Sequence, residues 1–98
     1  MRKETETIMK AFLNGESKTM TRTFTDGRKV LLHGNTIIEK HDNGYNLTLA
    51  NWPTNTTRER LNGFLTLAGY SHRFSQKNNE QFFDDTKISA DQTLFIER

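Results

Sequence analysis

The first apolar residues of the chain follow a helical spacing. Over residues 5–15 they recur at positions i, i+1, i+4 and i+5, which places them on one face of a helix, and Gly15 supplies the C-terminal stop. A helix of about three turns is marginal by itself. We therefore expect this face to pack on the rest of the protein or on a partner. It could cover one side of a sheet while a second helix, predicted below, covers the other side, or it could pair two copies of the chain as a homodimer. The residues of the face are Ile8, Met9, Phe12 and Leu13.

From Lys18 onward, apolar and polar residues alternate, which is typical of strands. Asp26-Gly27 and Asn43-Gly44 are both strong signals for two-residue hairpin turns. Gly34-Asn35 interrupts the stretch between them. The pattern predicts a meander of antiparallel strands that cover residues 18–25, 28–33, 36–40 and 45–50.

Trp52-Pro53 ends the preceding strand, because proline cannot donate to the ladder. A second helix is predicted after it, over about residues 57–68. Thr56 and Glu59 have the spacing of a capping box, in which each side chain bonds the backbone N–H of the other residue. Gly63, inside the helix, is expected where the helix closely approaches the sheet. The apolar stripe consists of Leu61, Phe64, Leu65 and Ala68, and Gly69 follows it.

The last third of the chain returns to alternation. Strands are predicted over 70–76 and from Gln81 to Phe83, and residues 88–96 supply a further strand or a tail packed on the sheet. The predicted fold class is α+β: an antiparallel sheet of four to six strands, one helix packed on it and a short N-terminal helix. We expect residues 1–17 to form an N-terminal helical extension and residues 18–98 to form a single α+β domain.

Composition narrows the class of protein. The chain has 98 residues, 33% of them hydrophobic, and no cysteine. It therefore has no disulfide framework, no thiol nucleophile and no cysteine-ligated metal. The longest apolar runs are far shorter than the roughly 20 residues that span a bilayer. We expect a cytoplasmic protein without a membrane partner.

Charge is distributed unevenly along the chain. Residues 1–16 are balanced, residues 17–77 hold nine basic and four acidic residues, and residues 78–98 hold two basic and five acidic residues. The middle segment thus has a net charge of +5, and the last segment has a net charge of −3. Such asymmetry attracts an anionic partner to the middle of the chain or a basic partner to its end.

No motif for catalysis or cofactor binding emerges. The histidines lie 8 and 31 residues apart, without the spacing of a helical metal pair. The acidic cluster Glu80, Asp84 and Asp85 lacks the alternation and the glycine of a calcium-binding loop. There is no glycine-rich phosphate loop and no nucleophile elbow. We predict a protein that is not an enzyme and that needs no metal or cofactor. The histidines are His33, His41 and His72.

A resemblance covers about half of the chain. Its residues are Thr21-Arg22-Thr23-Phe24, Leu32-His33-Gly34-Asn35-Thr36-Ile37, Leu49-Ala50-Asn51-Trp52-Pro53-Thr54-Asn55-Thr56-Thr57 and Arg60-Leu61-Asn62. This order of strand, small-residue break, strand, tryptophan before a threonine-rich cap, and helix resembles a group of small, mostly uncharacterised proteins of tailed bacteriophages. The resemblance implies a phage origin and this fold, and it brings no catalytic motif.

Nucleic-acid binding is one function that the basic residues support. Arginines near a helix N-terminus suit an anion, and strand aromatics such as Tyr45, Tyr70 and Phe74 can stack bases. The opposing interpretation is structural, because a small sheet needs these aromatics in its core. The candidate nucleic-acid-binding residues are Arg22, Arg28, Lys29, Arg58, Arg60 and Lys77.

Protein binding needs only a few aromatic or arginine anchors on a stable surface. Phe82 and Phe83 point to opposite faces of a strand, so one of them is exposed unless both faces are covered. The position of Trp52 between strand and helix favours a core role, although an exposed Trp52 would be an anchor. The candidate partner-binding residues are Arg58, Arg60, Trp52, Phe82, Phe83 and Arg73.

These observations together predict a small non-enzymatic phage accessory protein in the host cytoplasm. We expect it to bind a host protein and to block or redirect it, as an inhibitor in counter-defence or host takeover. The alternative is a small nucleic-acid-binding protein that uses the basic middle segment.

Overall fold

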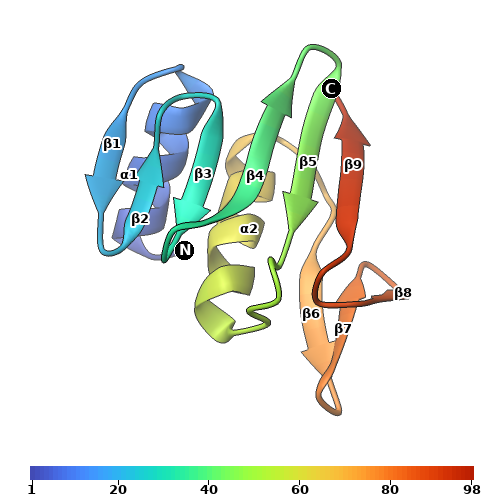
Figure 1. Cartoon of the computed structure of the whole chain (residues 1–98). Coiled ribbons are helices and arrows are strands. Elements are labelled where there is room, and N and C mark those ends of the chain that lie inside the picture. Colours follow the sequence, from blue (N-terminus) through green and yellow to red (C-terminus); the bar gives the residue numbers. More distant parts are fainter.

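The computed structural model describes all residues, 1–98, and confirms the α+β class. The strands form two antiparallel sheets, one with the order β1-β2-β3-β4-β5-β9 and one with the order β6-β7-β8 (Figure 1). The elements are α1 (Lys3–Leu13), β1 (Lys18–Met20), β2 (Thr23–Thr25), β3 (Lys29–Leu32), β4 (Asn35–His41), β5 (Gly44–Thr48), α2 (Asn55–Leu67), β6 (Phe74–Lys77), β7 (Glu80–Phe83), β8 (Thr86–Ile88) and β9 (Thr93–Glu97).

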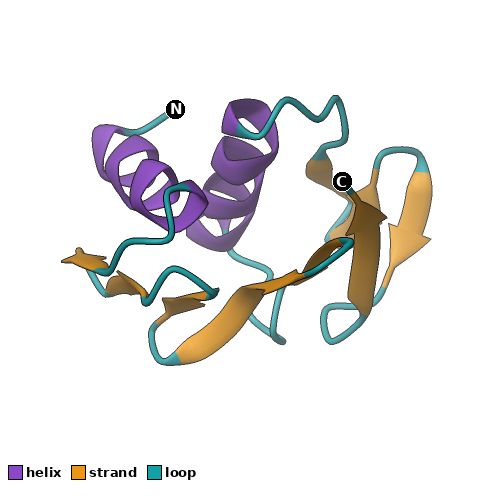
Figure 2. Ribbon diagram, turned by 90° about the horizontal axis from the view of Figure 1, so that it is seen from above, coloured by secondary structure: helices purple, strands orange, loops and turns teal.

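Both helices lie on the same face of the larger sheet, as Figure 2 shows. The expectation that the N-terminal helix covers the opposite face is therefore wrong. The apolar side of α1 packs into the interior, where Ile8, Met9 and Phe12 are fully buried. Because this side is used within the chain, it is not free to pair two copies unless α1 leaves the core.

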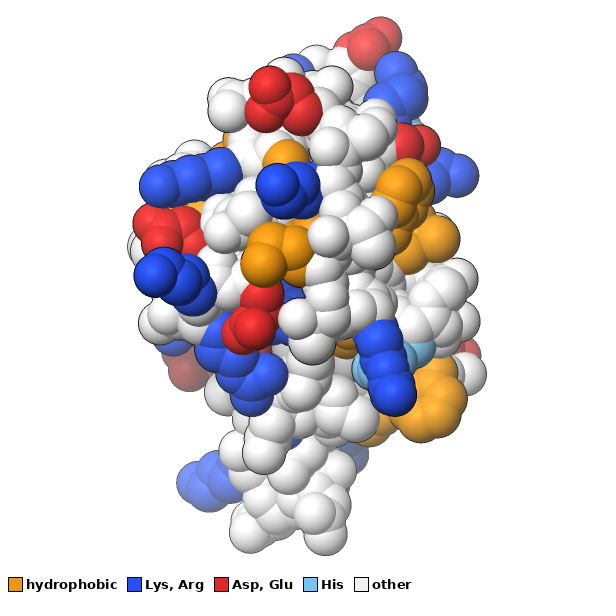
Figure 3. All heavy atoms as spheres, turned by 90° about the vertical axis from the view of Figure 1, so that its left-hand side faces the viewer, with side chains coloured by type: hydrophobic (Ala, Val, Ile, Leu, Met, Phe, Trp, Pro, Cys, Tyr) orange, Lys and Arg blue, Asp and Glu red, His pale blue; other side chains and the backbone are white.

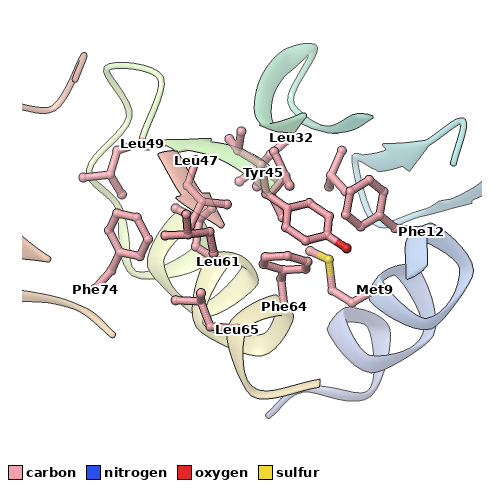
Figure 4. Close-up of a cluster of buried hydrophobic side chains, with 14 of the residues drawn as sticks. Met9, Phe12, Leu32, Tyr45, Leu47, Leu49, Leu61, Phe64, Leu65 and Phe74 are labelled. Atoms are coloured by element: carbon pink, nitrogen blue, oxygen red, sulfur yellow. The ribbon is translucent and has the colours of Figure 1, made fainter. Parts of the chain in front are cut away.

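One hydrophobic core joins α1 to the rest of the chain. The rings of Phe12, Tyr45 and Phe64 meet in it, with centroids 4.8–6.0 Å apart (Figure 4). They come from α1, β5 and α2. Burial of such a side chain contributes roughly 1.5–3 kcal/mol, so Phe12 is a substantial part of a small core. Helix α1 thus packs into the same hydrophobic core as β5 and α2.

The predicted strand over 18–25 is broken by a tight turn. Thr21 and Arg22 adopt φ values of 44° and 58°, the left-handed region that favours glycine or asparagine. This turn separates β1 from β2, which pair antiparallel. Its residue types do not signal a turn, which is why alternation alone predicted one long strand.

The second predicted hairpin is shifted by one residue. Asp42 and Asn43 make the turn, and Gly44 is the first residue of β5. Gly44 is needed there because a Cβ atom would collide with the backbone oxygen of Ile96 in the neighbouring β9. The pairing of β5 with β9 brings the last strand of the chain beside its middle.

Helix α2 begins earlier than predicted, and its cap is Thr54. The Thr54 hydroxyl accepts a hydrogen bond from the Thr57 N–H at 3.2 Å. The predicted capping box of Thr56 and Glu59 does not form, because the carboxylate of Glu59 turns toward α1 and bonds the Thr5 hydroxyl.

Gly63 marks a close approach, but between α2 and α1 rather than between helix and sheet. A Cβ atom on Gly63 would overlap the Cγ2 methyl of Thr5. Thr5 is itself fully buried and has little room to move. The contact therefore sets how closely the two helices pack.

We predict that Gly63→Ala destabilises the protein by about 1–3 kcal/mol, because the added methyl overpacks the helix contact. At an unhindered helical site the same change would stabilise by up to about 1 kcal/mol, so the sign of the effect is informative. Urea unfolding followed by circular dichroism measures it. Thr5→Ser removes the Cγ2 methyl and keeps the hydroxyl, so the double variant should be more stable than Gly63→Ala alone. Equal stability of the two would contradict the proposed contact.

Candidate functional site

A cavity of about 420 Å³ opens where the larger sheet meets the start of α2. We call it the Trp52 pocket. Its walls come from the β1–β2 turn, the β3–β4 turn, the chain after β5 and the first turn of α2. Leu32, Ile37 and Leu49 form an apolar floor, and each of them is buried.

Trp52 stands at the edge of this pocket and is 55% exposed. The expectation of a core role for Trp52 is therefore wrong. Ala50 and Asn51, with φ values of 52° and 64°, reverse the chain just before it. The Trp52 N–H donates to the Leu49 carbonyl oxygen at 2.9 Å. This turn leaves Leu49 in the core and directs the chain at Trp52 to the surface.

Arg22 supplies the formal charge at the pocket, and His33 lies beside it. The backbone N–H of His33 donates to the carbonyl oxygen of Arg22 at 2.9 Å, which holds the two turns together. Both residues are exposed, and neither takes part in an ion pair of the chain. The other two histidines pair with carboxylates: His41 with Glu39 at 3.2 Å and His72 with Asp84 at 2.7 Å.

The first turn of α2 forms the remaining wall, through Thr54, Thr56 and Thr57. No acidic residue lies in this turn, and no acidic side chain lines the pocket. The N-terminus of a helix carries a partial positive charge. The pocket thus combines apolar walls with an uncompensated positive rim.

Arg60 lies in the interior, with only 1% of its surface exposed. Its guanidinium donates to the Thr23 hydroxyl at 3.1 Å and to the Glu59 carboxylate at 2.8 Å, and also to the Thr5 hydroxyl. These groups come from β2, α2 and α1. The role of Arg60 is therefore internal, and the prediction that it contacts a partner is corrected.

Arg58 is also buried, at 8% exposure, and ties the smaller sheet to α2. Its guanidinium donates to the Pro53 carbonyl oxygen at 2.8 Å, to the Asn55 amide oxygen at 2.6 Å and to the Gln81 amide oxygen at 2.8 Å. Burial lowers the pKa of Arg58, since none of these partners is charged. Its donors are engaged within the chain, so the prediction of a surface contact is corrected here too.

The other predicted site residues do not gather at one place. Arg73 is exposed and reaches the Thr66 hydroxyl at 3.3 Å. Phe82 and Phe83 are half-buried, and the ring of Phe83 lies 5.0 Å from that of Phe74. None of these residues, nor Arg28, Lys29 or Lys77, lines the Trp52 pocket.

Positive charge is dispersed on the side of the molecule formed by α1, β1 and β2. Figure 3 shows basic, acidic and hydrophobic side chains interspersed there. Arg28 and Lys29 follow β2 at the end opposite the Arg22 turn, and Lys29 pairs with Glu39 at 3.6 Å. Lys77 ends β6 in the other sheet. The basic middle segment of the sequence therefore does not become one continuous basic surface here.

The acidic end of the chain has local partners. Asp84 accepts a hydrogen bond from the Arg73 N–H at 2.8 Å and bonds the ring of His72. Burial alone would raise the pKa of Asp84, but these hydrogen bonds lower it. No group of three or more potential ligand residues lies together in a way that could hold a metal ion. Neither helix has the length and apolar character needed to cross a membrane.

Prediction from the sequence missed His33 as a site residue and the proximity of Arg22 to Trp52. A histidine beside Gly34 in a turn is a weak signal, because turns bring many polar residues to the surface. The hydrogen bond between the two turns is visible only in the structure.

The fold and the site define a small α+β protein with a surface pocket. More particularly, the chain belongs to the family described as the Kyanoviridae Gp96 protein, whose model matches residues 1–97. The phage resemblance is thus confirmed, and the match also takes in α1 and the acidic C-terminal segment. No curated protein and no solved structure matches the chain.

We predict that the carboxylate of Glu59 makes the free energy of unfolding depend on pH in the acidic range. Burial alone would raise the pKa of Glu59, but hydrogen bonds from Thr5, the Arg2 N–H and Arg60 together lower it from 4.5. The stabilisation is present above the unfolded pKa and is lost as the pH falls through the lower folded pKa. Glu59→Gln should cost about 1–3 kcal/mol near neutral pH, and its deficit should shrink at acidic pH. Urea unfolding at a series of pH values measures this.

Glu16→Gln serves as the control for this experiment, because Glu16 is exposed and makes no ion pair. Its unfolding free energy should follow that of the wild type at every pH. A Glu59→Gln deficit that stays constant across the acidic range would show that the charge of Glu59 does not contribute.

Proposed function

We propose that this phage protein is a non-enzymatic accessory protein that binds a host protein and blocks or redirects it. The setting would be counter-defence or host takeover, in the cytoplasm of the host cell. The mechanism is steric: the bound phage protein covers a functional surface of its target. The proposal extends the family membership, which by itself establishes only a phage protein.

The exposed indole of Trp52 is the observation that carries this proposal. Tryptophan is enriched among the residues that dominate binding energy at protein interfaces. An aromatic side chain can bury about 150–250 Å², and here it adjoins an apolar cavity on the surface. Exposed apolar surface with a polar rim is typical of a protein interaction site.

The support for Trp52 also suits a binding site. The backbone at Trp52 is fixed by a tight turn, by its N–H bond to the Leu49 carbonyl oxygen, and by the Asn51 N–H, which donates to the Ala90 carbonyl oxygen at 2.9 Å. A site held in place in this way loses little conformational freedom on binding. With overall extents of 36 × 28 × 21 Å, the protein is large enough to present about 800 Å² to a partner.

Nucleic-acid binding is less well supported by the geometry. Two of its six candidate residues, Arg58 and Arg60, are buried and bonded within the chain. The other four lie at three places: Arg22 in the β1–β2 turn, Arg28 and Lys29 where β3 begins, and Lys77 at the end of β6. We retain this function as an outcome of the test below.

We predict that Trp52→Ala abolishes capture of the host target. Loss of such an anchor typically costs about 2 kcal/mol or more of binding free energy. Tagged wild-type and variant proteins are purified from infected cells after nuclease treatment, and bound host proteins are quantified. Wild type should retain one host protein in near-stoichiometric amount, and Trp52→Ala should not.

Phe95→Ala is the matched control, because Phe95 is another exposed aromatic residue, at 47%, and does not line the pocket. It should capture the target as wild type does. Equal capture by wild type and Trp52→Ala would refute the proposed site. Recovery of nucleic acid instead of protein, with oligonucleotide affinity falling steeply as salt rises, would establish the alternative function.

A further inference from the structure

Some turns around the Trp52 pocket use residues that the turns themselves do not favour. Arg22, His33 and Ala50 all have positive φ and all line the pocket. Such conformations are uncommon for residues other than glycine, asparagine, aspartate and histidine. The β6–β7 turn, which does not line the pocket, uses Asn78 and Asn79, the type that suits this geometry. The turn geometry therefore accounts for His33 but gives no reason for arginine at position 22.

The charge of the pocket selects for an anionic group. The charged and titratable side chains in its lining are Arg22 and His33, and neither forms an ion pair in the chain. The start of α2 adds its partial positive charge, although the Thr54 hydroxyl already accepts from the Thr57 N–H. A carboxylate at this rim would be attracted by the Arg22 guanidinium and by the start of α2, and it would lie within the same lining as the imidazole of His33.

The interior of the pocket selects for an apolar group. Its floor consists of the side chains of Leu32, Ile37 and Leu49, beside the indole of Trp52. A cavity of about 420 Å³ lies in the range that encloses most of a compact ligand. One large apolar side chain with its adjoining backbone fits this description.

We propose that the Trp52 pocket binds an acidic segment of the partner protein. In this arrangement an aromatic or large aliphatic side chain enters the cavity, and a neighbouring Asp or Glu meets Arg22 and His33 at the rim. The proposal rests on the proposed function and specifies the chemistry of the partner.

A peptide suits this site better than a nucleic-acid strand. A strand whose base stacks on Trp52 would need further cations along its phosphates. Arg28 and Lys29 lie at the opposite end of the three-residue strand β2 from Arg22, about 10 Å away at the usual rise per residue. No basic residue other than Arg22 and His33 continues the pocket lining.

The test begins with selection of a random peptide library on the wild-type protein, with counter-selection on Trp52→Ala. Enriched peptides should place a large apolar residue next to Asp or Glu. The most enriched peptide is then titrated against the protein beside a version in which Asn and Gln replace its acids. Trp52 is the only tryptophan, so its fluorescence reports on the pocket directly. The acidic peptide should bind at least about tenfold more tightly.

Arg22→Asn separates binding from folding, because asparagine suits the left-handed turn. Its thermal unfolding midpoint should equal or exceed that of wild type, while its affinity for the acidic peptide falls about tenfold. The control Arg28→Asn, in an exposed loop outside the pocket lining, should change affinity less than about twofold.

The outcomes distinguish this inference from the function on which it rests. If acidic and neutral peptides bind equally, or if no peptide depends on Trp52, the acidic-segment proposal is wrong. In that case capture of a host protein that is lost in Trp52→Ala would still uphold the proposed function. A labelled oligonucleotide that quenches Trp52 fluorescence in the wild type but not in Arg22→Asn would show that the pocket binds nucleic acid. That result would overturn the proposal of an acidic peptide segment. Host capture unaffected by Trp52→Ala would overturn the acidic-segment proposal alone, because a host protein would still be bound, but at another site.

Discussion

The buried charge of Arg60 constrains the rest of this structure. Removing a guanidinium from water is costly unless its donors are satisfied and a counter-charge is close. Thr23 in β2, Thr5 in α1 and Glu59 in α2 together meet this requirement. Because the partners come from three elements, both helices and the first hairpin must be in place together. The same arrangement positions the start of α2 beside the turn at Arg22, where the pocket forms.

Local patterns predicted the elements well where the core imposed a period. The apolar stripes of both helices and the alternation in β3 and in residues 45–48 of β5 follow directly from burial of one face. The turn at Thr21 and Arg22 escaped prediction, because neither residue type favours positive φ. The pairing of β5 with β9 also escaped, since it joins segments nearly 50 residues apart in sequence. The polar interior around Arg60 could not be foreseen, because arginine is rarely buried without partners that only the fold brings together.

The candidate site could be predicted only in pieces. Trp52 and Arg22 were each recognised as residues able to bind a partner, but in different hypotheses. The pocket is assembled from segments between residues 22 and 57, so no local pattern describes it. In the sequence Arg58 resembles a surface anchor. In the structure it is buried and donates a hydrogen bond to Gln81 of the smaller sheet. His33 forms no ion pair, whereas His41 and His72 each pair with a carboxylate. Only the structure shows this difference.

The place of β9 has a consequence for how the protein is made. Residues 93–97 form the outer strand beside β5, and the Arg98 N–H donates to the carbonyl oxygen of Asn43 at 3.0 Å. The larger sheet therefore stays incomplete until residues 93–97 have been synthesised, and until then β5 presents an unpaired edge. A nascent chain that stalls before residue 93 would therefore expose the edge of β5 to other chains.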